Sequence, residues 1–394
     1  MGAGYENPIG YLLSQFSRAA GEPKTVRGYE TLARRRLHPL MYANIAGGEG
    51  RELTIGRNRD SLDAVMLNPR CLVDVSTRDL STTILGQKAD LPIMMGFSGG
   101  LGLIDKSGEL GVARVAGKHG MISGALMHSS FRFEQMEAEA GGPFWLSIVH
   151  HDDRATAHVI EQANRLQSFK AVCLTVDTMV QGGVPDRKAA RRGLPLKQAL
   201  LSRKNKMWAP LDDMTDPVFH VGEPAGEVLN WRPQPLTQLE TWERLKWLRS
   251  LTDLPIVLKG IMSVEDAKLA ADHGCAGIVV SNHGGRIVDE APGAMSVLPE
   301  IVDAVGDAIE VYFDSGVRSG HDVFKALAVG ARAAFIGRPV YWGLASDGER
   351  GLDCIVTILK RELDRAMAYC GCADIAAVTR RCVRLPHPLG SYPD

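Results

Sequence analysis

Short apolar segments alternate with longer amphipathic segments along the chain after residue 90, and each apolar segment ends in small or polar residues. A short run that is apolar throughout is typical of a parallel strand covered by helices. The predicted strands span residues 92–96, 122–126, 144–149, 171–176, 255–258, 276–280, 310–313 and 333–336. Eight successive βα units predict the α/β class and a (β/α)8, or TIM, barrel.

Three further segments add to this barrel, which we expect to span residues 61–380. Residues 1–60 form a predicted N-terminal helical extension, and residues 381–394 a C-terminal tail. In the extension, apolar residues recur near helical spacing at Tyr29, Leu32, Leu37 and Met41, and Gly47 and Gly48 then end the helix.

A long insertion follows the fourth predicted strand at residues 184–236 and is rich in proline and basic residues. An insertion of this length is either a lid or interaction segment, or a crossover without structure of its own, and both interpretations stay open. Residues 189–209 also allow a third one, a basic segment lying on lipid. Its weak periodicity makes membrane binding the less favoured interpretation.

Charge and cysteine usage exclude several classes of function. The 394 residues carry 45 Lys and Arg against 46 Asp and Glu, a formal net charge of -1, so a broad positive field for nucleic acid or anionic lipid is missing. Seven dispersed cysteines without CxxC spacing argue against a disulfide framework or a zinc ribbon. With neither a signal peptide nor a long apolar run, we expect a soluble, cytoplasmic protein.

Barrel enzymes place their chemistry at the carboxyl ends of the strands, where this chain carries polar and small residues. These are Ser98, Gly99, Thr175, Asp177, Lys259, the SNHGGR segment 281–286, Asp314, Gly316, Arg318, Gly337 and Arg338. The segments DSGVRSG and IGRP follow the seventh and eighth strands, where barrels commonly bind phosphate. A phosphorylated ligand is therefore expected.

The SNHGGR segment carries the sharpest chemical signal. His283 can accept a proton near neutral pH, and Arg286 can hold a carboxylate, which together suit oxidation or enolisation of an acid with an α-hydroxyl group. Lys259 would add a fixed cation that stabilises negative charge on a cofactor or an enolate.

A metal site is not expected. His150, His151, Asp152 and Asp153 are adjacent, and neighbouring side chains of an extended segment point apart, so we interpret them as the start of a solvated loop.

Taken together, the segments DLSTTILGQKADLPI, LTVDT, LPIVLKGIMSVEDA, VVSNHGGR and VYFDSGVRSGHDVFKALAVGARAAFIGRP resemble the FMN-dependent α-hydroxy acid oxidase and dehydrogenase family over about residues 25–375. The opening YENPIG and the central insertion are most similar to its lactate 2-monooxygenase members. The resemblance implies FMN, a small-molecule substrate, dioxygen or another electron acceptor, and a homotetramer or octamer.

The resemblance also implies roles for individual residues. His283 would be the base, Asp177 its carboxylate partner, Arg286 the substrate carboxylate ligand, and Lys259 a neighbour of flavin N1 and O2. Residues expected to contact the flavin ring or its surroundings are Ser98, Gly99, Ser147, Thr175 and Ser281. Those expected to bind the ribityl chain and phosphate are Asp314, Gly316, Arg318, Gly337 and Arg338.

Four positions depart from the family pattern. Asn44 and Val149 replace two active-site tyrosines, Val184 replaces a second carboxylate-binding arginine, and Ser147 replaces a flavin-contacting glutamine. Each lost charge-assisted bond to a small substrate would cost about 1.5–3 kcal/mol, and the smaller side chains leave room. With His283 and Arg286, the residues Asn44, Val149 and Val184 define the expected substrate pocket.

We therefore expect an FMN-dependent oxidoreductase that oxidises the α-carbon of a hydroxy acid-like substrate larger than lactate or glycolate, in specialised metabolism. The resemblance implies proton abstraction by His283 and hydride transfer to flavin N5. Alternatives are flavin-dependent oxidation of an amine or amino acid carbon, and a catalytically impaired FMN-binding homologue. The substrate and the oxidase, dehydrogenase or monooxygenase outcome stay open.

Overall fold

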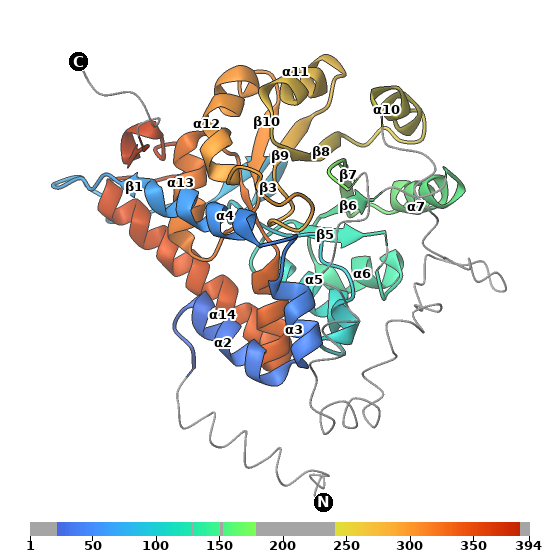
Figure 1. The fold of residues 1–394 in the computed structure, drawn as a ribbon, viewed down its shortest axis with the longest axis horizontal. Helices are drawn as coiled ribbons and strands as arrows, with labels where there is room; N and C mark the ends of the chain where they lie inside the picture. Colours follow the sequence, from blue (N-terminus) through green and yellow to red (C-terminus); the bar gives the residue numbers. More distant parts are fainter. Residues whose placement is uncertain (1–21, 128, 150–152, 179–240, 387–394) are drawn as a thin grey trace, which may run out of the picture.

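The computed structural model describes residues 22–127, 129–149, 153–178 and 241–386. Within them, eight parallel strands close into a barrel in the order β10-β11-β4-β5-β6-β7-β8-β9. The strands are β4 (Ile93–Met95), β5 (Ser123–Leu126), β6 (Phe144–Ile148), β7 (Phe169–Thr175), β8 (Ile256–Ile261), β9 (Gly277–Val280), β10 (Glu310–Phe313) and β11 (Ala334–Ile336). Each lies on one of the eight predicted strands, which confirms the TIM barrel (Figure 1).

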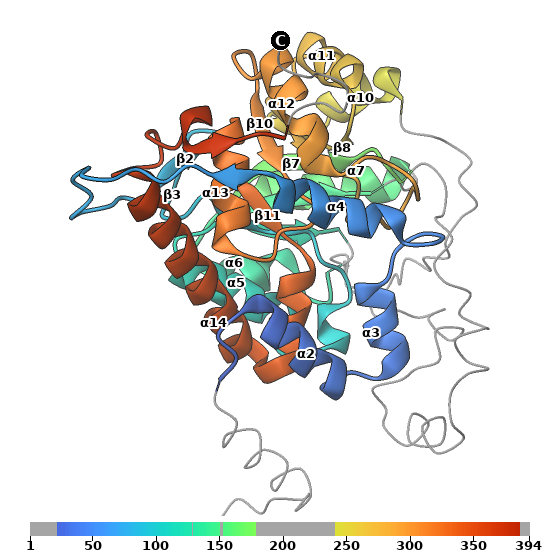
Figure 2. The ribbon, with the colours of Figure 1, turned by 60° about the vertical axis from the view of Figure 1, so that its left-hand side comes forward.

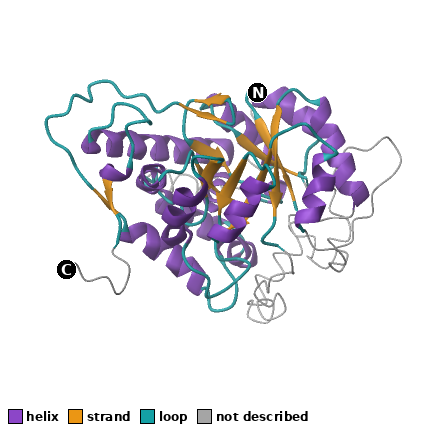
Figure 3. Cartoon of the chain, turned by 90° about the horizontal axis from the view of Figure 1, so that it is seen from above, coloured by secondary structure: helices purple, strands orange, loops and turns teal. Residues whose placement is uncertain are grey.

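A helix follows every strand and packs outside the barrel (Figure 3). In chain order these are α5 (Gly108–Lys118), α6 (Phe133–Ala140), α7 (Asp153–Arg165), α10 (Trp242–Arg249), α11 (Val264–Asp272), α12 (Ala294–Val305), α13 (Gly320–Val329) and α14 (Arg338–Cys370). Hydroxyl side chains start several of them: Ser263 caps α11 and Ser319 caps α13, each accepting a backbone N–H of the first turn. None of the described helices is long and apolar enough to cross a membrane.

The barrel interior is packed with side chains. Trp145, Tyr312 and Phe335 lie in it fully buried, and the rings of Trp145 and Tyr312 meet edge to face with centroids 5.1 Å apart. A filled interior leaves no pore, so ligands must bind at an end of the barrel.

A hairpin closes the amino-terminal end of the barrel. It consists of β2 (Thr82–Ile84) and β3 (Gln87–Ala89), and Ile84 at its tip is buried with the interior side chains. The backbone N–H of Leu85 donates to the Glu310 carboxylate at the start of β10, at 3.2 Å. The Tyr312 hydroxyl donates to the same carboxylate at 2.6 Å. The opposite end therefore has to carry the chemistry.

The N-terminal extension is helical in its described part, as α2 (Val26–Arg36), α3 (Pro39–Ala46) and α4 (Leu53–Ala64). The single helix expected up to Gly47 is broken before Pro39, because proline lacks a backbone N–H and disfavours a helical residue before it. Helix α2 lies along α14, and α4 crosses the barrel beside α12 (Figure 2). The extension thus covers the barrel instead of hanging from it.

At the other end of the chain, β12 (Val383–Arg384) pairs antiparallel with β1 (Met66–Leu67). These residues lie in the predicted C-terminal tail, so the start of that tail is anchored beside the start of the barrel. The predicted insertion 184–236, with Val184, lies outside the described residues.

Candidate active site

The SNHGGR segment leaves β9 in an unusual backbone conformation. His283, Gly284 and Gly285 have φ angles of 56°, 67° and 77°, all in the left-handed region. Glycine adopts this region freely, whereas histidine does so at an energetic cost that the surroundings must offset. A Cβ atom on Gly285 would come within 2.9 Å of the Ile55 backbone nitrogen on α4, so glycine is required for the close approach of that helix.

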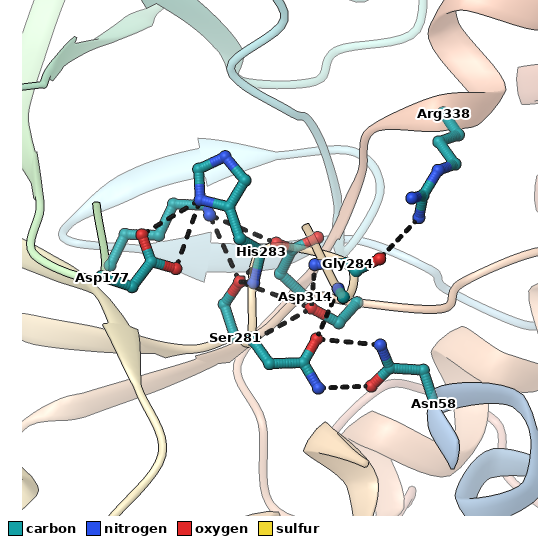
Figure 4. A network of polar contacts seen from close by, with 11 residues as sticks. Asn58, Asp177, Ser281, His283, Gly284, Asp314 and Arg338 are labelled. Atoms are coloured by element: carbon teal, nitrogen blue, oxygen red, sulfur yellow. Dashed lines mark hydrogen bonds and ion pairs between the residues drawn. The ribbon is translucent and has the colours of Figure 1, made fainter. Parts of the chain in front are cut away.

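His283 faces Asp177, which lies two residues beyond β7 (Figure 4). Its Nδ1 is 3.0 Å and 3.2 Å from the two carboxylate oxygens of Asp177. Burial alone would raise the pKa of Asp177, but its interaction with His283 and the positive charge of Lys259 hold it below its ordinary value. An ionised Asp177 accepts a hydrogen bond from the N–H group at Nδ1. This tautomer leaves Nε2 of the same ring without a proton, so that Nε2 can accept one. The pair has the form of an oriented general base.

A bulge in β8 makes room for this carboxylate. Gly260 has a φ angle of 110°, and a Cβ atom there would lie 2.6 Å from the Asp177 side chain. The strand register shifts at the same place, between Lys259 and Ile261. Glycine at position 260 therefore lets Asp177 pack against β8.

Lys259 provides a buried positive charge next to this pair. Its Nζ is 3.2 Å from the Ser281 hydroxyl and 3.4 Å from the Asp314 carboxylate. Burial alone would lower the pKa of Lys259, but the charges of Asp314 and Asp177 hold it above its ordinary value. Lys259 pairs with Thr175 of β7 in the barrel register, so both sit at the same strand-end level.

Two serine hydroxyls hold the backbone around His283. Ser281 Oγ donates to Asp314 at 2.7 Å and accepts the His283 N–H at 3.1 Å. Ser315 Oγ, after β10, accepts the N–H groups of Asn282 and Gly284 at 3.2 and 3.1 Å. Lys259 of β8 and the segments after β9 and β10 thereby form one hydrogen-bonded unit.

Arg286 lies against the end of α3. Its Nη1 donates to the backbone carbonyl of Asn44 at 2.5 Å. The structure therefore brings the Arg286 side chain to the backbone of Asn44. Val149 follows β6 and lies two residues after Ser147, whose side chain is on the interior side of the barrel with that of Trp145.

Two arginines lie where phosphate binding was predicted. Burial lowers the pKa of Arg318 to about 10 and that of Arg338 to about 9. The Arg318 guanidinium stacks on the Trp342 ring at 4.6 Å. The Arg338 guanidinium donates to three backbone carbonyls, those of Ile45, Gly47 and Gly284, at 2.8–2.9 Å. Its side chain thus ties α3 to the SNHGGR segment.

The surroundings of these arginines fit the phosphate of FMN. A Cβ atom on Gly337 would meet no atom within 4 Å, which marks open space at the beginning of α14. The first N–H groups of a helix have no partner within it and attract anions. Gly316, with a φ of 91°, lies in the preceding strand-end turn. An anion would also compensate the buried charges of Arg318 and Arg338.

Residues of β6 and β7, and one just after β4, support the ring end of an FMN site. Ser98, Ser147 and Thr175 are buried, and the Ser147 hydroxyl has no hydrogen-bond partner within the described chain. A buried polar atom without a partner favours a ligand that supplies one. Gly99 is held by the Tyr341 hydroxyl, which donates to its carbonyl at 2.8 Å.

Tyr341 and Asn58 were not anticipated as site residues. Tyr341 belongs to the first turn of α14, three residues after Arg338, and the segment IGRPVY would have suggested it as a neighbour of the strand end. Asn58 lies on α4, over 200 residues from the SNHGGR segment that it contacts, and nothing local in the sequence marks it. No described group of His, Cys, Asp and Glu side chains is placed to hold a metal ion.

A barrel with a histidine and carboxylate pair, a buried lysine, and two buried arginines with open space at Gly337 after its last two strands is typical of a cofactor-dependent barrel enzyme. The FMN-dependent dehydrogenase family matches residues 33–385. Human 2-hydroxyacid oxidase 1 is 38% identical over 364 residues, covering 91% of this chain and 96% of that protein. L-lactate oxidase of a Nostoc species is 37% identical over 369 residues, covering 91% and 97%.

Solved structures of mandelate oxidase are also similar. A variant with (S)-mandelic acid has a TM-score of 0.79 and 33% identity, covering 93% of this chain and 100% of the other. The complex with benzoyl-formic acid has a TM-score of 0.76 and 32% identity, covering 92% and 98%. The chain therefore belongs to the FMN-dependent dehydrogenase family, and it is an oxidoreductase whose cofactor is FMN. This confirms the resemblance inferred from the strand-end motifs.

Proposed function

We propose that this protein oxidises the α-carbon of a 2-hydroxy acid, with His283 as the general base. The observation that carries the proposal is the contact of His283 Nδ1 with Asp177 at 3.0 Å, on the loop that also carries Arg286. A flavin-holding protein without chemistry would need the phosphate cradle and Lys259, but no base with its own carboxylate.

Each site residue has a separate role in this reaction. His283 takes up the proton that leaves the substrate, and the negative charge of Asp177 stabilises the resulting imidazolium. Arg286 binds the substrate carboxylate, and the Lys259 charge stabilises negative charge that develops beside it. FMN, when bound, supplies the two-electron acceptor, held by Lys259 at its ring end and by the residues around Gly316, Arg318 and Gly337 at its phosphate.

We further propose that the substrate carries a side chain bulkier than the methyl group of lactate. Val149 lies two residues after Ser147, directly beyond β6, and both are smaller than the residues that they replace in the family pattern. Mandelate oxidase, similar over 92–93% of this chain, has been solved with aromatic hydroxy acid and keto acid ligands. An aryl-substituted 2-hydroxy acid fits both observations. Dioxygen or another acceptor would then reoxidise the flavin, and assembly into a homo-oligomer belongs to the same proposal.

Anaerobic flavin bleaching tests the substrate class. The FMN-loaded protein is mixed with glycolate, lactate, mandelate and matched amino acids, and flavin absorbance is followed by stopped flow. We expect reduction by mandelate with at least a tenfold higher second-order rate constant than by glycolate. A preference for glycolate or lactate would refute the larger pocket. Reduction by amino acids alone would refute the hydroxy acid assignment.

The His283→Ala variant tests the base. Flavin reduction should slow by about 10² to 10⁴, the usual contribution of a positioned general base, while FMN stays bound. His273→Ala, at the end of α11, is the matched control because it removes an imidazole far from the strand ends. An unchanged reduction rate in His283→Ala would remove the proposed role.

A further inference from the structure

Asn58 on α4 and Asn282 after β9 form a reciprocal amide pair. The Nδ2 of each residue donates to the Oδ1 of the other, both at 2.8 Å (Figure 4). Only 3% of Asn58 and 7% of Asn282 is exposed, so water cannot replace these bonds. Buried amides of this kind are costly to leave unpaired.

The remaining capacity of the two amides closes both ends of one loop. Asn282 Oδ1 accepts the Gly285 N–H at 3.1 Å, and Asn282 Nδ2 donates to the Pro292 carbonyl at 3.0 Å. Asn58 Oδ1 accepts the N–H of Ala294 at 3.0 Å, the first residue of α12. The pair therefore joins the start of the loop 282–294 to its end, and Asn58 supplies the cap that Gly293 cannot.

His283 directly follows this clamp. Its left-handed φ of 56° is maintained only where the neighbouring groups determine the backbone. The serine hydroxyls fix the N–H groups of residues 282, 283 and 284. The side chain of Asn282 is fixed from the other direction, by α4.

We propose that Asn58 is a positioning residue for catalysis: by pairing with Asn282 it holds the backbone that aims His283 at Asp177 and the substrate. The proposal rests on the proposed role of His283. It assigns a part of the catalytic apparatus to the N-terminal extension, outside the barrel.

The pairing imposes a chemical requirement that can be tested. Position 58 must present a donor to Asn282 Oδ1 and an acceptor to Asn282 Nδ2 and the Ala294 N–H. A protonated carboxylic acid meets this requirement, whereas an ionised carboxylate turns an acceptor toward another acceptor. Burial raises the pKa of a carboxyl group, which brings that switch toward neutral pH.

The experiment compares Asn58→Ala and Asn58→Asp with the wild type as FMN-loaded proteins. In anaerobic stopped flow with mandelate, Asn58→Ala should reduce its flavin at least tenfold more slowly at saturation, with the apparent substrate Kd changed less than threefold. The flavin reduction rate of Asn58→Asp, divided by that of the wild type at the same pH, should fall as pH rises from 5 to 8. The same ratio for Asn58→Ala should not change with pH. FMN fluorescence titration and thermal melting show whether each variant is folded and loaded.

Hydrogen exchange gives a readout independent of turnover. Peptides covering residues 281–286 should exchange faster in Asn58→Ala, while peptides of β6 and β7 should not. Ser346→Ala is the matched control, because it removes a different buried bond to the extension, from Ser346 Oγ to the Tyr29 carbonyl at 3.2 Å. It should leave both the reduction rate and exchange at residues 281–286 unchanged.

Several results would overturn the proposal. These are a wild-type reduction rate in folded Asn58→Ala, unchanged exchange at residues 281–286, or an equal loss of rate in Ser346→Ala. If Asn58→Ala does not fold, Asn58→Asp provides the test: a reduction rate relative to the wild type that does not change with pH overturns the proposal. A wild type that no hydroxy acid reduces would instead refute the proposed function, and the exchange measurement would still decide whether Asn58 holds the loop.

Discussion

The charge states of individual side chains in this site depend on the charged groups beside them. Asp177 and Lys259 are both buried, and burial disfavours their charged forms. Each keeps its charge through an oppositely charged partner. The histidine, the lysine and their two carboxylates come from four different strand ends. Charge at this end of the barrel is therefore a property of the group, and a change in one member alters the others.

The Asp177 carboxylate predicts a dependence of stability on pH. Its pKa is lower in the folded protein than in the unfolded chain, so the unfolded chain binds more protons and the carboxylate's stabilisation is complete above about pH 4, near the ordinary value for Asp. It is lost as pH falls through the lower folded value. Asp177→Asn should therefore show a weaker fall in melting temperature than the wild type between about pH 4 and 3.

Thermal melting followed by tryptophan fluorescence measures this difference. Asp63→Asn is the control, because the Asp63 side chain is 65% exposed and its ion pair with Arg59 is weak at the surface. Parallel acid limbs for the wild type and Asp177→Asn would show that the carboxylate has no special role in the folded state.

Secondary-structure elements are joined at this end of the barrel by side chains that cross between them. Arg338, the first residue of α14, reaches three backbone carbonyls: that of Ile45 in α3, that of Gly47 just beyond α3, and that of Gly284 after β9. The sequence suggested a phosphate ligand at this position. The structure adds a second role, because the guanidinium connects three elements. The backbone at the helix start faces the same open space at Gly337.

Removal of this guanidinium should loosen the extension. Arg338→Ala leaves three carbonyls without their donor, and one hydrogen bond to a charged group contributes about 1.5–3 kcal/mol. We expect the free energy of unfolding in urea to fall by at least that amount, and proteolysis within residues 37–52 to accelerate. Arg332→Ala is the matched control, since Arg332 is half exposed with a loose 3.8 Å contact to Glu310. Equal proteolysis of both variants would contradict the connecting role.

At the scale of the whole molecule, the two ends of the barrel differ: one is closed by apolar packing, and the other carries the candidate active site. The hairpin β2–β3 closes the amino-terminal end with Ile84, and the strand-end network occupies the other. Substitutions at the closed end should therefore change the free energy of unfolding without changing substrate binding or the flavin reduction rate.

Ile84→Ala tests this separation. Loss of a fully buried isoleucine side chain should lower the free energy of unfolding by about 2–5 kcal/mol. The apparent Kd for mandelate and the flavin reduction rate should stay within twofold of the wild type at 20 °C. Urea unfolding and stopped flow on the same preparation measure both. A reduction rate that fell in proportion to stability would show that the two ends are coupled.

The parts of the molecule that repeat along the chain were predictable from the sequence. All eight strands were predictable because each is a short, mainly apolar run. His283, Asp177 and Lys259 were predictable because barrel topology gathers strand ends. Pro39 itself indicates a helix break, but the helical spacing of the apolar residues around it predicted one continuous helix. Asn58, Tyr341 and the course of the Arg338 side chain were not predictable, because they depend on contacts between elements distant in sequence.

The amide of Asn58 and the carbonyls of residues 44, 45 and 47 all belong to the segment before the barrel, yet they hold the loop of the proposed base. A chimaera that grafts residues 22–64 of a relative onto this barrel would therefore exchange part of the catalytic machinery. Such hybrids should differ in turnover even where every strand-end residue is kept.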